Sequence, residues 1–157
     1  KALLEEIPEV MKIYETARCF MAEHGNPTQW VNGYPSEELV TEDCKNGELY
    51  VCISDEQIAG VFMFTKKPDI TYREIFQGKW LNEKPYGTMH RMASSGIKKG
   101  VSSFCLDWCF KQCGNVRGDT HEDNYVMQNV FEKNGFKRCG IIYVADKTPR
   151  IAYQREN

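Results

Sequence analysis

The chain has 157 residues, of which 41% are hydrophobic, so it can bury a core of its own without disulfides. Its 20 basic and 22 acidic residues give a formal net charge of −2, and the two signs are interspersed. This pattern excludes the basic stripe of a nucleic-acid-binding domain. No apolar stretch approaches the roughly 20 residues that cross a bilayer. We therefore expect a single domain over residues 1–157, with neither a nucleic-acid nor a membrane partner.

The seven cysteines are an odd number for a disulfide framework. Cys105, Cys109 and Cys113 recur every four residues, which places them on one side of a helix. A zinc site is the alternative interpretation, but no CxxC pair or nearby HxxxH completes four ligands. A free cysteine is a small buried apolar residue in most reduced proteins. The free cysteines and the lack of a signal peptide predict a cytoplasmic protein. The spacing of the cysteines predicts that it holds no metal.

In the first half, hydrophobic spacing and turn residues predict two helices and a hairpin. Pro8 suits a first helical turn, and Gly25 ends the helix. Gly60, inside a strand, indicates a bulge or a close packing contact. The expected elements are a helix over 7–24, a short helix from Ser36 to near Gly47, strands over 48–54 and 57–65, and a long connection over 66–85.

The second half alternates strands with helices, which predicts a mixed sheet with right-handed crossovers. The expected elements are strands over 86–94 and 115–119, helices over 100–113 and 124–134, and a final strand pair over 136–144 and 150–154. The helix over 100–113 is apolar on most faces, so we expect it to pack deeply against the sheet.

Residues 90–103, HRMASSGIKKGVSS, place a glycine-containing loop between a strand and a helix. Glycines let backbone N–H groups approach a ligand, and a helix start adds unpaired donors and the positive end of the dipole. This arrangement suits a phosphate or pyrophosphate, although many such turns contain glycine for geometry alone. The loop is not a P-loop, because GxxxxGK[ST] is absent, and it lacks the dinucleotide GxGxxG.

Residues 92–103, followed by NYVMQNVFEKNGF at 124–136, resemble the two central motifs of the GCN5-related N-acetyltransferase (GNAT) family. The order of elements is similar across nearly the whole chain. The resemblance implies an α/β (α+β) fold with a mixed, mostly antiparallel sheet of about six or seven strands flanked by helices. Its central parallel pair, 86–94 and 116–119, would be splayed to admit acyl-CoA. The family usually has one more strand before the first helix, and here it would be truncated or very short.

The resemblance also implies an acetyl-CoA site. The backbone of residues 92–94 would pair with the pantetheine arm like an added strand. Amides from Lys98 to Ser103 would hold the pyrophosphate. Asn124 would hydrogen-bond the pantetheine arm, and Phe131 would lie against it. The implied cofactor-binding residues are Met92, Ala93, Ser94, Lys98, Lys99, Gly100, Val101, Ser102, Ser103, Asn124 and Phe131, with acetyl-CoA as cosubstrate and no metal.

Two positions depart from the family pattern. Ile97 stands where the family usually has Arg or Gln, which removes one side-chain donor from the loop. Phe131 stands where the family often has a tyrosine that protonates the leaving thiolate, and phenylalanine cannot donate a proton. Either another group does so or the thiolate leaves unassisted, since a free thiol has a pKa of about 8.5.

Direct acetyl transfer needs a donor for the oxyanion and a route for the proton of the amine. The backbone N–H near Met92 is the candidate oxyanion donor. His90 precedes it by two residues, so a regular strand would place both on one face, where His90 could take the proton. A hydrogen-bonded structural role for His90 is the alternative. Arg91 should point to the other face and form a salt bridge.

A polar cluster follows the strand over 115–119. Asp119 or His121 could belong to the amine site. The alternative, which we favour, makes Asp123 the cap of the next helix and leaves the rest as a solvated loop.

The sequence thus predicts transfer of an acetyl group from acetyl-CoA to a primary amine of a small molecule or peptide. A noncatalytic acyl-CoA-binding or sensing module is the alternative, in which Phe131 marks lost chemistry. A thiol redox or zinc protein rests on the cysteine count alone. Homodimers are common in the resembled family, so a homodimer is a further expectation.

Overall fold

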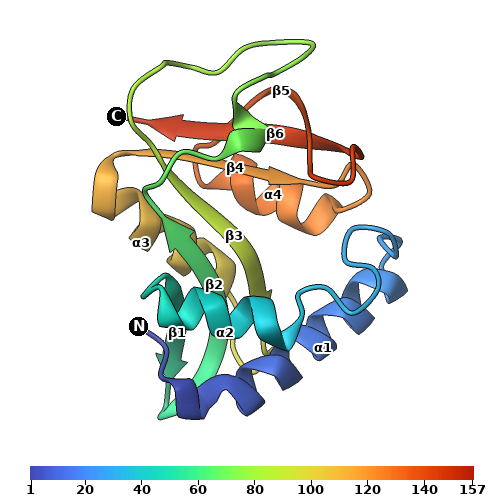
Figure 1. Ribbon diagram of the computed structural model, residues 1–157, viewed down its shortest axis with the longest axis vertical. Coiled ribbons are helices and arrows are strands. Elements are labelled where there is room, and N and C mark those ends of the chain that lie inside the picture. The colour runs from blue at the N-terminus through green and yellow to red at the C-terminus, as the bar shows by residue number, and fades with distance from the viewer. The chain divides into compact units, whose positions relative to one another are not determined.

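The computed structural model describes residues 1–157, and the chain divides into two compact units. The first unit contains residues 1–64 and 90–105, and the second contains residues 65–89 and 106–157. The boundaries fall inside two strands and one helix, which therefore contribute to both units. Figure 1 labels the α-helices and the strands. No helix has the length and apolar character to span a membrane.

The elements follow the predicted order. They are a 3-10 helix Leu4–Glu6, α1 Ile7–Glu23, α2 Glu37–Lys45, β1 Leu49–Ser54, β2 Gln57–Thr65, a 3-10 helix Ile70–Tyr72, β3 Gly87–Ser94, α3 Val101–Cys113, β4 Asn115–Thr120, α4 Tyr125–Lys133, β5 Lys137–Tyr143 and β6 Pro149–Glu156. The strands form a six-stranded sheet in the order β1-β2-β3-β4-β6-β5. No strand precedes α1, although the amide of Ala2 donates to the carbonyl of Leu49 at 2.8 Å.

In the first unit, α1 and α2 pack on one face of the β1–β2 hairpin (Figure 1). Val10, Ile13 and Tyr14 lie at helical spacing on α1, and together with Val40 and Leu49 they form a buried apolar cluster. α2 begins where the sequence predicts, because the Ser36 hydroxyl accepts a hydrogen bond from the Leu39 amide at 3.2 Å.

The β1–β2 hairpin contains the irregularity that Gly60 predicts. The antiparallel register shifts between Cys52, which pairs with Gly60, and Ile53, which pairs with Ile58. A Cβ atom at Gly60 would lie 2.6 Å from Cγ1 of Val101. Gly60 therefore lets the first turn of α3 approach the hairpin closely.

In the second unit, β6 pairs antiparallel with both β4 and β5. The parallel ladder between β3 and β4 contains two residue pairs, Gly87–Val116 and Thr88–Arg117, although both strands continue beyond it. The sheet is thus mostly antiparallel with one parallel pair, and the predicted fold class is confirmed.

The long connection before β3 covers the edge of the sheet. Phe76 and Ile141 exchange two backbone hydrogen bonds of 2.8 Å, and the Lys79 amide donates to the Cys139 carbonyl at 3.0 Å. Further along, the Arg117 guanidinium lies 4.2 Å from the centroids of both Trp80 and Tyr86. The connection thus protects β5 from pairing with another chain.

The α4 helix begins one residue later than the sequence analysis expected. Its N-cap is Asn124, whose Oδ1 accepts from the Met127 amide at 3.0 Å. The expectation that Asp123 caps this helix is wrong, because Asn124 is an equally good capping residue and stands next to the first helical turn.

Only part of the apolar surface of α3 is buried. Val101, Cys105, Leu106 and Cys109 are buried, whereas Phe104 is 64% exposed. All seven cysteines are free thiols. The stripe of cysteines therefore contributes small apolar side chains to the buried side of the helix.

Candidate functional site

The loop between β3 and α3 has two left-handed glycines. Gly96 has φ +85° and Gly100 has φ +78°, and nothing lies within 4 Å of a Cβ built on either. A residue with a side chain adopts this conformation at a cost that glycine avoids. The two glycines therefore reverse the chain between the strand and the helix and keep the backbone between them open.

The amides of residues 98–102, which lead into α3 and begin it, have no hydrogen-bond acceptor among the protein's own groups. The first helical hydrogen bond runs from the Phe104 amide to the Gly100 carbonyl at 3.0 Å, and the amides of residues 98–102 make none. The two preceding amides do have partners, because Gly96 donates to Ser94 Oγ at 3.2 Å and Ile97 to Ser95 Oγ at 3.3 Å. The serines thus shape the loop and leave the following amides available.

Charge and exposure at this loop favour an anion. Lys98 and Lys99 are exposed, and the helix that begins at Val101 has 13 residues, so its positive dipole end lies at the same place. Anions bind at such helix starts because N–H groups and the dipole act together. The arrangement can hold a phosphate or pyrophosphate group.

β3, which leads into this loop, is not a regular strand. Arg91 has φ +53°, a left-handed conformation that is rare for a residue with a side chain. Its guanidinium forms a two-pronged ion pair with Asp43, with Nε to Oδ2 at 2.9 Å and NH2 to Oδ1 at 2.8 Å. NH1 also donates to the hydroxyl of Tyr34 at 3.2 Å. The predicted salt bridge of Arg91 is therefore present.

The buried ion pair carries a desolvation cost. Burial raises the pKa of the Asp43 carboxyl even though Arg91 acts to lower it. Removing either partner of such a pair leaves an uncompensated buried charge, which is more costly than the pair itself. Arg91 and Asp43 are therefore strongly coupled.

The carbonyl of Arg91 is also fixed. Tyr14 is fully buried on α1, and its hydroxyl donates to that carbonyl at 2.9 Å. Burial raises the pKa of Tyr14, so the phenol keeps its proton and remains a donor. The peptide that joins Arg91 to Met92 is thus held from the side of α1.

The left-handed Arg91 changes the interpretation of His90. In a regular strand His90 and Met92 would share a face, but a left-handed residue between them interrupts the alternation. His90, Arg91 and Met92 are all half-buried, in contrast to the buried residues on either side. The role of His90 as a base stays a prediction.

The remaining predicted residues belong to the second unit. The Oδ1 of Asn124 is engaged in the α4 cap. Phe131 is 1% exposed, and its ring stacks on Tyr153 with centroids 4.7 Å apart. Its tip lies against Gly118, where an added Cβ would be 2.8 Å from Cζ. In this structure Phe131 packs in a core, and its contact with pantetheine stays a prediction.

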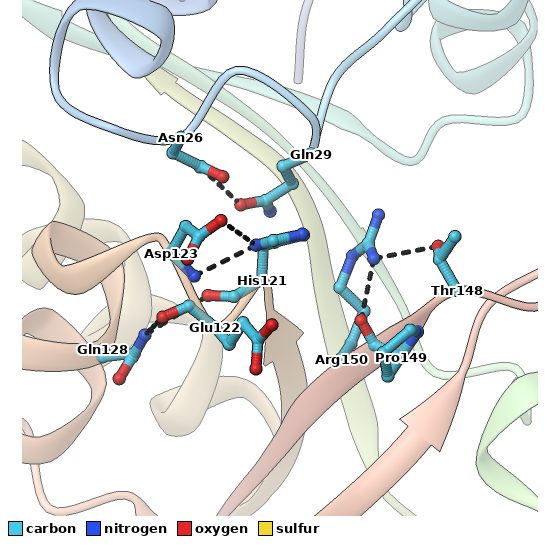
Figure 2. A network of polar contacts seen from close by, with 9 residues as sticks. All are labelled: Asn26, Gln29, His121, Glu122, Asp123, Gln128, Thr148, Pro149 and Arg150. Carbon is cyan, nitrogen blue, oxygen red and sulfur yellow. Dashed lines mark hydrogen bonds and ion pairs between the residues drawn. The ribbon is translucent and has the colours of Figure 1, made fainter.

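The polar cluster after β4 is ordered by hydrogen bonds (Figure 2). The Asp123 amide donates to Nδ1 of His121 at 3.0 Å, so in the neutral imidazole Nε2 carries the proton. Gln128 donates to the carbonyls of both His121 and Glu122. At the end of β4, Asp119 accepts from the hydroxyl of the buried Tyr72 at 2.6 Å. The segment is therefore more ordered than a solvated loop.

A GNAT-family acetyltransferase from Streptococcus agalactiae 2603 has a solved structure that is similar to this protein along nearly its full length. The match covers 99% of this chain and 92% of the other, at 31% sequence identity and a TM-score of 0.91. The chain belongs to the GNAT acetyltransferase family. No protein-family model matches the chain, and no curated protein matches it.

More distant GNAT structures share the fold. A GNAT-family acetyltransferase from Listeria monocytogenes 4b F2365 matches 99% of this chain and 92% of its own, at 17% identity and a TM-score of 0.73. AAC(6')-Ib in complex with ribostamycin and coenzyme A matches 98% of this chain and 89% of its own, at 15% identity and a TM-score of 0.61. At these identities the likeness shows the fold alone.

Three residues that contact predicted site residues are not indicated by any sequence pattern. Tyr14 falls at an apolar helical position and Asp43 in an acidic run, so neither pattern indicates a polar contact with β3. Tyr72 lies in the long connection, and only the folded chain brings its hydroxyl to Asp119. These contacts join residues 47 to 77 positions apart, which local patterns do not encode.

Proposed function

We propose that this GNAT protein transfers an acetyl group from acetyl-CoA to a primary amine of a small molecule or peptide. The observation that carries the proposal is the run of amides over residues 98–102, which have no acceptor in the protein and stand at the head of α3. Amides arranged in this way favour the pyrophosphate of coenzyme A. Lys98 and Lys99 add positive charge, and Ser102 and Ser103 lie in the same helical turn.

The chain supplies the other groups that direct transfer needs. The backbone of residues 92–94 pairs with the pantetheine arm, and the Met92 N–H donates to the oxygen of the thioester as negative charge develops on it. The neutral amine attacks the carbonyl carbon, and His90 takes the proton directly or through a water molecule. The carbon–sulfur bond then breaks, and the coenzyme A thiolate leaves without a proton from Phe131.

The amine acceptor is proposed by class. AAC(6')-Ib, which shares the fold, has been solved with ribostamycin. A small molecule with amino groups is therefore a reasonable first class to test. We further propose that the protein acts as a single cytoplasmic domain without a metal, and that it forms a homodimer.

A noncatalytic acyl-CoA-binding module is the second candidate. Phe131 favours it, because the ring is 1% exposed, stacks on Tyr153 and has no hydroxyl to donate. In that case the protein binds acetyl-CoA and responds to it without turnover.

One experiment separates the two candidates. Acetyl-CoA is titrated by calorimetry, and thiol release is then followed with amino acids, polyamines, aminoglycosides and peptide N-termini as acceptors. Binding followed by release with at least one amine supports the acetyltransferase. Binding without release for any amine supports the module, and absence of binding overturns both.

A further inference from the structure

We propose that Tyr14 and the Arg91–Asp43 ion pair are positioning residues, which aim the peptide N–H of Met92 at the thioester of acetyl-CoA. The inference rests on the proposed function, because the thioester is where that N–H acts. None of the three residues touches the reacting atoms in this account. They act through one peptide group of β3.

The geometry of a peptide group links the Arg91 carbonyl to the Met92 N–H. The carbonyl of Arg91 and the N–H of Met92 belong to one planar unit, and in a trans peptide they point in opposite directions. The peptide is trans, since the chain has a single cis bond, between Tyr34 and Pro35. The Tyr14 hydroxyl holds the carbonyl end at 2.9 Å. The Met92 N–H must therefore point away from α1.

The left-handed conformation of Arg91 is held by its side-chain contacts. A left-handed residue with a side chain inside a strand is strained, and it persists when its surroundings over-determine it. Here the side chain of Arg91 is 12% exposed and that of Asp43 is 6% exposed, and two short hydrogen bonds join them. Tyr34 receives a third hydrogen bond from the same guanidinium. The side chain thus anchors one end of the peptide group while Tyr14 anchors its carbonyl.

A fixed peptide group matters for the proposed oxyanion donor. An oxyanion donor is effective when it is aimed in advance, because no reorganisation is then needed as charge develops. If the Arg91–Met92 peptide were free to rotate, the N–H would lose that aim. Tyr14 and Asp43 keep the peptide in one orientation in the free protein, before acetyl-CoA arrives.

The test uses Tyr14→Phe and Asp43→Asn in the full chain. Tyr14→Phe keeps the buried ring and removes only the hydroxyl, so it stays informative if Asp43→Asn fails to fold. Tyr143→Phe and Asp107→Asn are the matched controls, because the Tyr143 ring is 44% exposed and Asp107 belongs to an exposed ion pair with Lys111. Neither control residue belongs to the proposed site.

Two readouts are measured. The first is the amide resonance of Met92 in the free protein. The second is the resonance of the thioester carbon in bound acetyl-CoA labelled with ¹³C at the acetyl carbonyl, together with kcat and KM for an accepted amine. We expect the variants to shift the amide resonance of Met92 in the free protein. In the wild type the hydrogen bond from Met92 should move the resonance of the thioester carbonyl carbon downfield, and the variants should lose that shift. They should also lower kcat about tenfold, with little change in KM for acetyl-CoA. That loss is smaller than the roughly hundredfold loss seen when a donor is removed outright.

The outcomes separate this inference from the proposed function. Wild-type protein that binds no acetyl-CoA overturns both. A second outcome overturns the positioning role alone. In it the wild type binds and turns over acetyl-CoA, and Tyr14→Phe leaves both the Met92 amide resonance and the shift of the thioester carbon unchanged. A loss of kcat that the Tyr143→Phe control shares also overturns it.

Discussion

Phe131 stands where the family resemblance implies a tyrosine, and its ring tip lies directly on Gly118 of β4. The ring also stacks on Tyr153 and contacts Phe136. An aromatic ring enclosed in this way has a clear packing role, whatever else it contacts when ligand is bound.

Gly118→Ala tests this packing. The added Cβ would lie 2.8 Å from Cζ of Phe131, and the buried ring has little room to move. We expect the free energy of unfolding to fall by about 1–3 kcal/mol, as for other overpacked cores. Urea unfolding measures the change. A second variant that also carries Phe131→Leu should recover part of the loss, and additive effects would show that the two positions do not touch.

His90→Ala tests the proposed base. We expect kcat to fall by about a hundredfold or more, in the range of lost general-base catalysis, while the affinity for acetyl-CoA changes little. Steady-state kinetics with an accepted amine and calorimetry with acetyl-CoA give the two quantities. Equal kcat in the variant and the wild type would assign His90 a structural role.

Tyr153 should contribute a pH dependence to stability. Burial and the hydrogen bond to Glu132 raise its pKa to about 12. An exposed tyrosine has a pKa near 10. The contribution of the Tyr153 phenol to the free energy of unfolding is therefore fully present below about pH 10. It is lost as the pH rises toward 12, because only the phenol of the unfolded chain ionises in that window.

The comparison with Tyr153→Phe isolates this contribution. Urea unfolding is measured at several pH values between about 9 and 12. The wild type should lose more free energy of unfolding over this window than the variant. Parallel curves for the two proteins would contradict the raised pKa.

Among the elements, the loop and helix over residues 95–113 show most directly how a sequence pattern produces the proposed phosphate site. Two left-handed glycines, two serines that hold preceding amides, and a helix start together leave the amides of 98–102 without partners. Each of these features has a local cause in the sequence.

Gly100→Ala, compared with Gly25→Ala, tests the loop. Both glycines are left-handed, with φ +78° and +80°, and neither has a neighbour within 4 Å of an added Cβ. We expect each variant to lose about 1 kcal/mol of unfolding free energy through backbone strain. Only Gly100→Ala should weaken acetyl-CoA binding, by about tenfold, because the strain at this position displaces an amide that donates to the charged phosphates. Equal affinities of the two variants, measured by calorimetry, would contradict the loop assignment.

Local patterns were sufficient for most elements. Apolar spacing, the Ser36 cap and the glycine after α1 predict the helices, and alternation predicts the strands to within a few residues. The start of α4 was misplaced because Asp123 and Asn124 have similar capping ability and stand side by side. The left-handed Arg91 could not be predicted, since its cause lies in Asp43 and Tyr14, 48 and 77 positions away.

At the scale of the whole molecule, membership of the GNAT family fixes the sheet and its short parallel ladder. It does not fix the acceptor, because related sites on one fold serve many substrates. The proposed pyrophosphate loop and the Arg91–Met92 peptide both belong to the first unit, which contains residues 1–64 and 90–105. In the proposed function, one compact unit therefore supplies both the phosphate-binding amides and the oxyanion donor.

In the proposed function, main-chain amides at the head of α3 receive the phosphates of coenzyme A. Amide hydrogen exchange of the protein with and without coenzyme A, resolved by residue, tests it most directly. We predict that the amides of residues 98–102 exchange rapidly in the free protein, in keeping with their lack of acceptors, and slow strongly when coenzyme A binds. Saturating binding that leaves exchange at these amides unchanged would contradict the account.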